Sequence, residues 1–177
     1  MMRLTSLLLS SILLTTTLPA LAASDLQVGF SPAVGGPSAL DVVTQGIDSA
    51  HRQILVAAYS FTSKPIATAQ VAAKKRGVDV EVVADEKANG GKYSAVTFLA
   101  NQGVPVRLNG HYAIMHNKFM VIDGQAVETG SFNYTQAAAE PNAENALLLR
   151  NVPDLARAYT QDFQKLWNEG QPLSPRY

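Results

Sequence analysis

Cysteine is absent from this 177-residue sequence. Disulfide bonds, zinc sites with thiolate ligands and a cysteine nucleophile are therefore excluded. Without such cross-links, the stability of the fold has to come from its core. Hydrophobic residues make up 47% of the 177 positions, which suits one domain with a substantial interior but not two.

An excess of charge of either sign is also missing. The sequence contains 14 Lys and Arg against 14 Asp and Glu, so its formal net charge is zero. A strongly basic protein attracts polyanions through its overall electric field, and this composition produces no such field. Any affinity for nucleic acid must therefore come from a local cluster of basic side chains.

Residues 1–23 have the pattern of a secretory signal peptide. Arg3 precedes a short apolar block at residues 7–14, and the segment ends on the small residues Ala22 and Ala23. The block is too short to span a bilayer, which argues against a membrane anchor. We therefore expect a single mature domain, residues 24–177, that is periplasmic or secreted. Export without cysteine suits a bacterial periplasm.

The rest of the chain alternates between strand and helix patterns. Apolar runs predict strands at residues 26–30, 53–59, 78–84, 104–108, 119–122, 126–129 and 146–149. Amphipathic runs with capping residues predict helices at residues 38–49, 63–76, 95–102 and 152–168. Strands alternate with helices through the first two thirds, and a group of strands follows. This order predicts an α/β fold with a mixed β-sheet flanked by helices on both faces.

Polar side chains gather around the predicted strand at residues 119–122. His116 and Lys118 are two residues apart, so on an extended chain they project from the same face. Asp123 begins an Asp-Gly turn, and the next strand should return Ser131 and Asn133 to the same edge. The ammonium, hydroxyl and amide of these residues are donors that suit a phosphate, whose non-bridging oxygens gain charge during displacement.

The spacing H-x-K-x4-D-x6-G-S-x-N, from His116 to Asn133, resembles the signature of the phospholipase D superfamily. The chain is similar to the small bacterial nucleases of that family, which carry one copy of the motif. Residues 59–62 and 142–145 also resemble family segments. The resemblance therefore extends from residue 24 to the C-terminus and implies a phospholipase D-like α/β/α sandwich.

The resemblance implies a two-step displacement at phosphorus. His116 would attack to give a phosphohistidine while a second histidine protonates the leaving oxygen, and water would then reverse the roles. A neutral imidazole and its protonated partner are suited to these tasks near pH 7. Lys118 and Asn133 would hold the non-bridging oxygens, assisted by Ser131. No metal and no cofactor is expected.

The remaining candidate residues have supporting or alternative roles. In the family the aspartate of the motif is mainly structural, so Asp123 is expected to support the site. Glu144 is the candidate carboxylate that orients His116 and stabilises its protonated form. His111 offers an alternative metal site with His116, a weak one because the chain has three histidines and no cysteine. His51 is interpreted as a helix cap.

The mechanism needs two histidines, but the chain carries one copy of the motif and no internal repeat. We therefore expect a symmetric homodimer that shares one active centre across its two-fold axis. His111 is the alternative acid if the protein acts as a monomer.

Two basic segments are candidate contacts for nucleic acid. Residues 74–76, Lys-Lys-Arg, are more typical of a solvated helix end. The polar segment at residues 87–93 has two lysines and a tyrosine and is the better candidate for backbone contacts.

Together these features predict a metal-independent phosphodiesterase, a non-specific endonuclease acting on DNA or RNA. The alternative is a phospholipase D-type lipid hydrolase. No amphipathic interfacial helix is visible in the sequence, so no stable membrane association is expected. A non-catalytic binding module is the third possibility, and the intact motif argues against it.

Overall fold

The structure is a computed structural model that describes residues 25–91 and 94–176. The predicted signal peptide, residues 1–23, lies outside the described residues. No helix within the described ranges has the length and apolar character needed to cross a membrane.

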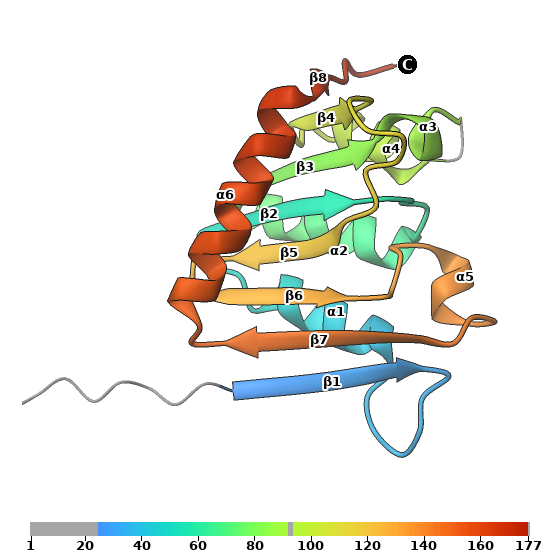
Figure 1. The fold of residues 1–177 in the computed structure, drawn as a ribbon, viewed down its shortest axis with the longest axis vertical. Coiled ribbons are helices and arrows are strands. Elements are labelled where there is room, and N and C mark those ends of the chain that lie inside the picture. Colours follow the sequence, from blue (N-terminus) through green and yellow to red (C-terminus); the bar gives the residue numbers. More distant parts are fainter. Residues whose placement is uncertain (1–24, 92–93, 177) are drawn as a thin grey trace, which may run out of the picture.

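The described chain folds into one eight-stranded sheet in the order β1-β7-β6-β5-β2-β3-β4-β8 (Figure 1). The strands are β1 (Asp25–Ser31), β2 (Gln53–Ala58), β3 (Asp79–Asp85), β4 (Val106–Asn109), β5 (Lys118–Ile122), β6 (Ala126–Gly130), β7 (Glu144–Arg150) and β8 (Gln171–Pro172). The helices are α1 (Ala39–Asp48), α2 (Lys64–Lys75), α3 (Glu86–Asn89), α4 (Ala95–Asn101), α5 (Gln136–Ala139) and α6 (Pro153–Glu169).

Parallel and antiparallel pairing coexist in the sheet. β2 pairs in parallel with β3, and β3 with β4, whereas β5, β6, β7 and β1 follow one another antiparallel. The unbroken apolar run of β2 makes it a central strand, and its residues from Ile54 to Ala58 are all buried. The mixed sheet predicted from the sequence is confirmed.

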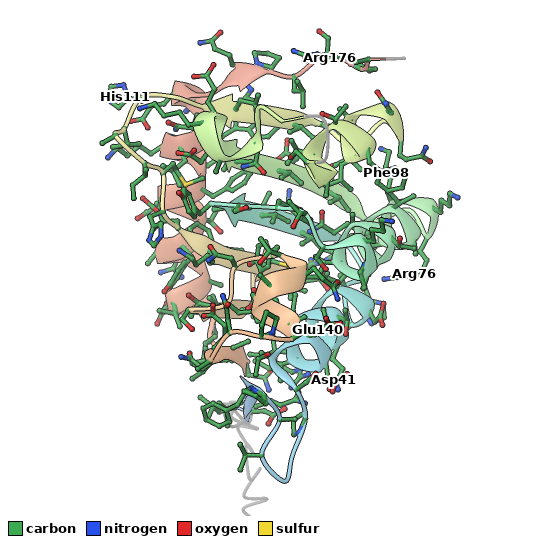
Figure 2. All side chains as sticks on the ribbon, turned by 90° about the vertical axis from the view of Figure 1, so that its right-hand side faces the viewer. Asp41, Arg76, Phe98, His111, Glu140 and Arg176 are labelled. Carbon is green, nitrogen blue, oxygen red and sulfur yellow. The ribbon has the colours of Figure 1, made fainter. Side chains whose placement is uncertain are left out.

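Helices cover both faces of this sheet. In the edge-on view of Figure 2, α6 lies on one side and the helices that carry Asp41 and Phe98 lie on the other. One hydrophobic cluster fills the space beneath α1, α2 and α4, and a smaller one, with Phe163 and Leu166 of α6, fills the other side. The fold is therefore the predicted α/β sandwich.

Three short elements, α3, α5 and β8, were not predicted from the sequence. The polar segment at residues 87–93 begins inside α3, where Asn89 is buried rather than solvent-facing. Its side chain accepts the backbone N–H of Phe61 at 3.0 Å and donates to the carbonyl oxygens of Tyr59 and Asp85. The expectation that this segment contacts nucleic acid is therefore wrong for Asn89, because its amide ties three segments of the fold together. Residues 92–93 lie outside the described residues.

The basic segment at residues 74–76 is the helix end that its sequence suggested. Lys74 and Lys75 lie in the last turn of α2, where positive charge opposes the helix dipole favourably. The Arg76 guanidinium donates to the carbonyl oxygens of Ile47 and Asp48 at 3.2 and 3.4 Å. It therefore links α2 to the end of α1.

Asp123 occupies the tight turn between β5 and β6 and organises a neighbouring loop. Its φ of 55° and the 67° of Gly124 are the left-handed values of a hairpin turn. The carboxylate accepts the backbone N–H groups of His51, Arg52 and Gln53 at 2.9, 2.7 and 2.9 Å. Burial alone would raise the pKa of Asp123, but these hydrogen bonds lower it overall because they stabilise the charged form.

Replacing Asp123 with alanine should destabilise the fold by about 2 kcal/mol at pH 7, because three N–H groups lose a charged acceptor. Since the pKa of Asp123 is lowered in the folded state, its stabilisation is present above the unfolded value and is lost as pH falls below it. Urea unfolding at pH 7 and at pH 3 measures both effects. The exposed Asp48→Ala is the control. An equal loss for both variants would contradict the structural role.

Candidate active site

The ends of three strands meet at one edge of the sheet and bring most of the motif residues together. β5 begins at Lys118, the antiparallel β6 ends at Gly130 beside it, and β7 starts at Glu144. A pocket of about 500 Å³ opens there. Its lining residues are His116, Asn117, Lys118, Phe119, Thr129, Gly130, Ser131, Asn133, Glu144 and Tyr159. Five residues singled out in the sequence therefore line one pocket.

Lys118 is 9% exposed, which is unusual for a lysine. Its Nζ donates to the carbonyl oxygen of His116 at 2.6 Å and lies 3.1 Å from Nδ1 of the same imidazole. Burial lowers the pKa of Lys118, while the Glu144 carboxylate partly offsets this by favouring the charged ammonium. The site therefore holds a poorly solvated cation directly beside an imidazole, as the binding of an anionic group requires.

The contact between Lys118 and His116 also has a consequence for the imidazole. A charged lysine is a donor only, so an imidazole with an unprotonated Nδ1 can accept this contact. A substrate oxygen that binds Lys118 would compete with Nδ1 for the ammonium.

Ser131 and Asn133 reach the pocket because the residues between and after them are apolar and buried. Phe132 is 1% exposed and Tyr134 is 0% exposed, so the alternating polar side chains point the other way. Oδ1 of Asn133 is buried and has no hydrogen-bond partner within the described residues. Buried amide atoms are usually paired. This oxygen could accept a hydrogen bond from a ligand, whereas Nδ2 of the same amide is the atom that could donate to a phosphate oxygen.

Glu144 lies in the pocket, but its carboxylate holds other side chains. Among the described residues its hydrogen-bond donors are Ser131 Oγ at 2.6 Å and Asn142 Nδ2 at 3.0 Å, not His116. Ser131 in turn accepts the backbone N–H of Asn145 at 3.1 Å. Glu144 therefore orients the serine in this structure, and its proposed action on His116 stays a prediction.

Tyr59 is a site residue to which the sequence analysis gave no role. It follows β2, whose Ala58 pairs with Lys118 in the sheet register. Its ring centroid lies 4.6 Å from that of His116, and Lys118 Nζ lies 5.4 Å from the ring centre. The pairing of β2 with β5 creates this contact, and a residue adjacent to a buried strand was the sequence signal for it.

Three other candidates lie away from the pocket. Asp123 is at the opposite end of β5, about 16 Å along the strand from Lys118 at the usual rise per residue. His51 contributes its backbone N–H to Asp123, and the helix cap of α1 is Ser49. His111 packs its ring against Tyr112 and is not among the residues that line the pocket. The described residues contain no group of three or more His, Asp or Glu arranged to hold a metal ion.

Comparison with known proteins identifies the family and the fold. The family model described as cardiolipin synthase, PLD-like domain matches residues 43–167. Among solved structures, the phospholipase D family member Nuc from Salmonella typhimurium is 44% identical, with 86% of this chain and 99% of that chain covered and a TM-score of 0.82. NucT from Helicobacter pylori, at 24% identity and a TM-score of 0.73 over 85% of this chain and 100% of that one, shares the fold.

Curated relatives carry lipid-related names. A phospholipase D of Rickettsia typhi is 32% identical over 83% of this chain and 70% of its own length. A mitochondrial cardiolipin hydrolase of Xenopus tropicalis is 35% identical over 71% of this chain, and the match spans 59% of that protein.

The family model, the match to Nuc and the phospholipase D relatives together show that this protein is a phosphodiester hydrolase. The family match contains every residue that lines the pocket and covers most of the chain. The chain belongs to the phospholipase D-like family.

Proposed function

We propose that this protein is a metal-independent endonuclease that cleaves DNA or RNA with little sequence preference, through a phosphohistidine intermediate. The observation that carries the proposal is the contact of Lys118 with His116 inside an open pocket that also holds Asn133. The match to nearly the full length of Nuc supports a small single-domain enzyme. Little sequence preference fits a pocket whose donors suit the backbone phosphate, because phosphate contacts carry no direct base information.

The first step forms a bond between His116 and phosphorus and breaks the bond from phosphorus to the leaving ester oxygen, which takes a proton from an acid. Lys118 and Asn133 stabilise the non-bridging oxygens as their charge increases. In the second step a water molecule attacks the phosphohistidine, gives its proton to the same group that acted as acid, and frees His116.

The acid in this scheme is a second histidine. Among the described residues that line the pocket, His116 is the one histidine. A second copy of the chain, related by a two-fold axis, would supply another His116 to a shared centre. The active enzyme that we propose is therefore a homodimer.

An exposed apolar surface beside the pocket supports this dimer. Leu26, Val28 and Phe30 on the edge strand β1 are 59%, 38% and 45% exposed. Their cross-strand partners include Leu149 and Leu147, so all five project from one sheet face. α6 packs on strands β2 to β6 of that face. A contiguous apolar surface of this kind is typical of a protein interface.

This surface also adjoins the catalytic pocket. Phe30 is paired with Asn145, the residue that follows Glu144 of the pocket lining. A second copy bound to this surface would therefore lie next to the site that needs its histidine.

We also propose, from the signal-peptide pattern of residues 1–23, that the enzyme is exported to the periplasm.

Hydrolysis of a phospholipid is the second candidate function, since curated relatives are named phospholipase D and cardiolipin hydrolase. The two activities share the same chemistry at phosphorus. They differ in the groups that the phosphodiester joins, which are nucleosides in a nucleic acid and a lipid and its head group in a phospholipid. The apolar surface of β1 and β7 is a place where a lipid chain could lie.

A substrate panel tests the proposal. Purified protein is given single-stranded and double-stranded DNA, RNA and a head-group-labelled cardiolipin at equal phosphodiester concentration. We expect cleavage of nucleic acid at several sites and much slower release of the lipid label. Faster lipid turnover would replace the nuclease assignment with the second candidate, and no cleavage of any substrate would refute both.

Excess chelator should leave the rate of substrate cleavage unchanged. The reason is that Lys118 and Asn133 are proposed to provide the electrostatic stabilisation that a metal ion provides in other nucleases. The same reactions are run with EDTA and then with magnesium restored. Activity that disappears in EDTA and returns with magnesium would contradict metal independence while leaving the substrate assignment intact.

A further inference from the structure

A buried acid lies behind the catalytic pocket, on the sheet face opposite α6. Glu128 of β6 is 1% exposed and Tyr134 is 0% exposed. The Tyr134 hydroxyl donates to Oε2 of Glu128 at 2.7 Å. Charged residues are seldom buried unless they are paired, and the partner here is a neutral hydroxyl. The mechanism described above uses neither side chain.

The pair spans the loop that carries two pocket residues. Glu128 lies three positions before Ser131, and Tyr134 directly follows Asn133. Glu128 is fixed from the sheet side, because its Cα partners are Met120 and Leu148 on the flanking strands. The hydrogen bond therefore closes a ring of seven residues, Glu128 to Tyr134, that contains the pocket segment.

Tyr134 is also fixed to the segment that follows Tyr59. Its carbonyl oxygen accepts the backbone N–H groups of Thr62 and Ser63, both at 2.9 Å. Its ring meets Phe61 edge-on, with centroids 5.6 Å apart. Because Tyr59 contacts His116, a shift of Tyr134 would disturb both sides of the pocket.

Burial raises the pKa of Glu128 to about 8, and the hydrogen bond from Tyr134 lowers it only in part. The pKa of Tyr134 is itself raised, by burial first and then by Glu128. Several charged side chains lie on the elements that surround Glu128 and Tyr134. They are Lys118 on β5, Glu144 and Arg150 on β7, Asp41 and Asp48 on α1, Lys64, Lys74 and Lys75 on α2, and Glu140 after α5. Neither Glu128 nor Tyr134 owes its shift to any of them, so burial is what favours the neutral form of the acid.

We propose that Glu128 in its neutral form and Tyr134 are positioning residues for catalysis: their buried hydrogen bond holds Ser131 and Asn133 in the pocket, and ionisation of Glu128 loosens that loop. The inference rests on the proposed hydrolysis at the same pocket. On this proposal, the fall in activity at high pH depends on Glu128, a residue that does not touch the substrate.

The direction of the pH effect follows from the raised pKa. Between the unfolded value near 4.5 and the folded value of about 8, the folded protein keeps a proton that the unfolded chain releases. The contribution of Glu128 to stability is complete below that range and is lost as pH rises through about 8. Loosening of the loop should therefore appear on the alkaline side.

The test compares wild type with Glu128→Gln, whose amide can accept the same hydrogen bond but cannot ionise. Hydrolysis of bis(4-nitrophenyl) phosphate is followed from pH 6 to pH 9.5. We expect a constant ratio of variant to wild-type kcat up to about pH 7, rising several-fold in favour of the variant through about pH 8. The exposed Glu140→Gln is the matched control and should follow wild type throughout. A ratio that stays flat across the range would overturn the proposal.

Tyr134→Phe removes the hydroxyl but keeps the ring. It should lower kcat about 5- to 10-fold at pH 7, with a smaller change in KM, because one hydrogen bond that fixes Asn133 is lost. Circular dichroism at each pH verifies that the variants remain folded. Wild-type kcat in the Tyr134→Phe variant would also contradict the positioning role.

A carboxyl carbon-13 NMR titration of the wild type keeps the test independent of activity and of whether the variants fold. One glutamate should titrate near pH 8, and the Gln variant should lack that signal. If the wild type hydrolyses no phosphodiester, the proposed function fails, while the titration still reports whether Glu128 is a neutral buried acid. If every glutamate titrates below pH 6, the positioning proposal fails even in an active enzyme.

Discussion

His116→Ala should lower the turnover rate by about 10⁴-fold or more and should leave no trapped phosphoenzyme. In the proposed mechanism the imidazole forms the bond to phosphorus, and loss of the nucleophile would leave only the contribution of the remaining donors. Ser131→Ala should cost far less, about 10²-fold at most, because one hydroxyl among several donors is removed. The ratio between the two variants is therefore the informative quantity.

Quenching the reaction of phosphorus-labelled substrate with denaturant at alkaline pH, where the bond between phosphorus and nitrogen is stable, measures the covalent intermediate directly. A phosphohistidine is expected in wild type and in Ser131→Ala, and it should be lost on acid treatment more readily than a phosphoserine. Labelled protein in His116→Ala would assign the nucleophile to another residue. Lys118→Met is a useful companion variant, because it removes the ammonium that holds Nδ1 of His116 at 3.1 Å.

Mixing wild type with His116→Ala subunits should inactivate every mixed dimer. If one centre needs both His116 side chains, activity follows the square of the wild-type fraction, so an equal mixture keeps about a quarter of the undiluted activity. The subunits are refolded together in known proportions, so that they associate at random. A linear dependence, with about half of the activity retained, would mean that each chain carries a complete site.

The apolar surface of β1 and β7 provides the control for this experiment. Val28→Glu and Phe30→Glu each place a charge on the surface that we assign to the interface. Sedimentation should show a shift to monomer, with loss of activity in proportion. A monomer that stays fully active would instead favour an acid from within the chain, for which His111 was the candidate.

The order of elements and the location of the motif were predictable from the sequence. Apolar runs and capping residues identified seven of the strands and the four long helices to within a few residues. Side-chain alternation also placed Ser131 and Asn133 at the edge where β5 begins, because antiparallel neighbours return the chain to its starting edge. Local periodicity is sufficient for such features.

The short elements α3, α5 and β8 were not predicted from the sequence, because they are too short to show a periodic pattern of apolar residues. Asn89 is an example: a polar residue in a Gly-rich segment suggests a solvated loop, yet its amide bonds to partners as far as 30 residues away. Asp123 is another, since its three N–H donors lie 70 to 72 residues earlier in the chain. Contacts at such separation leave no pattern in a single sequence.

The sequence by itself determined which groups are candidates for the reaction: the positions of His116, Lys118, Ser131 and Asn133 resemble the phospholipase D signature. Only the tertiary structure decided their partners. It placed the Lys118 ammonium against Nδ1 of His116, and it turned the Glu144 carboxylate toward Ser131. The physical reason is that the spacing along a strand fixes the direction of a side chain, whereas its protonation and hydrogen bonds depend on burial and on neighbours that other segments bring.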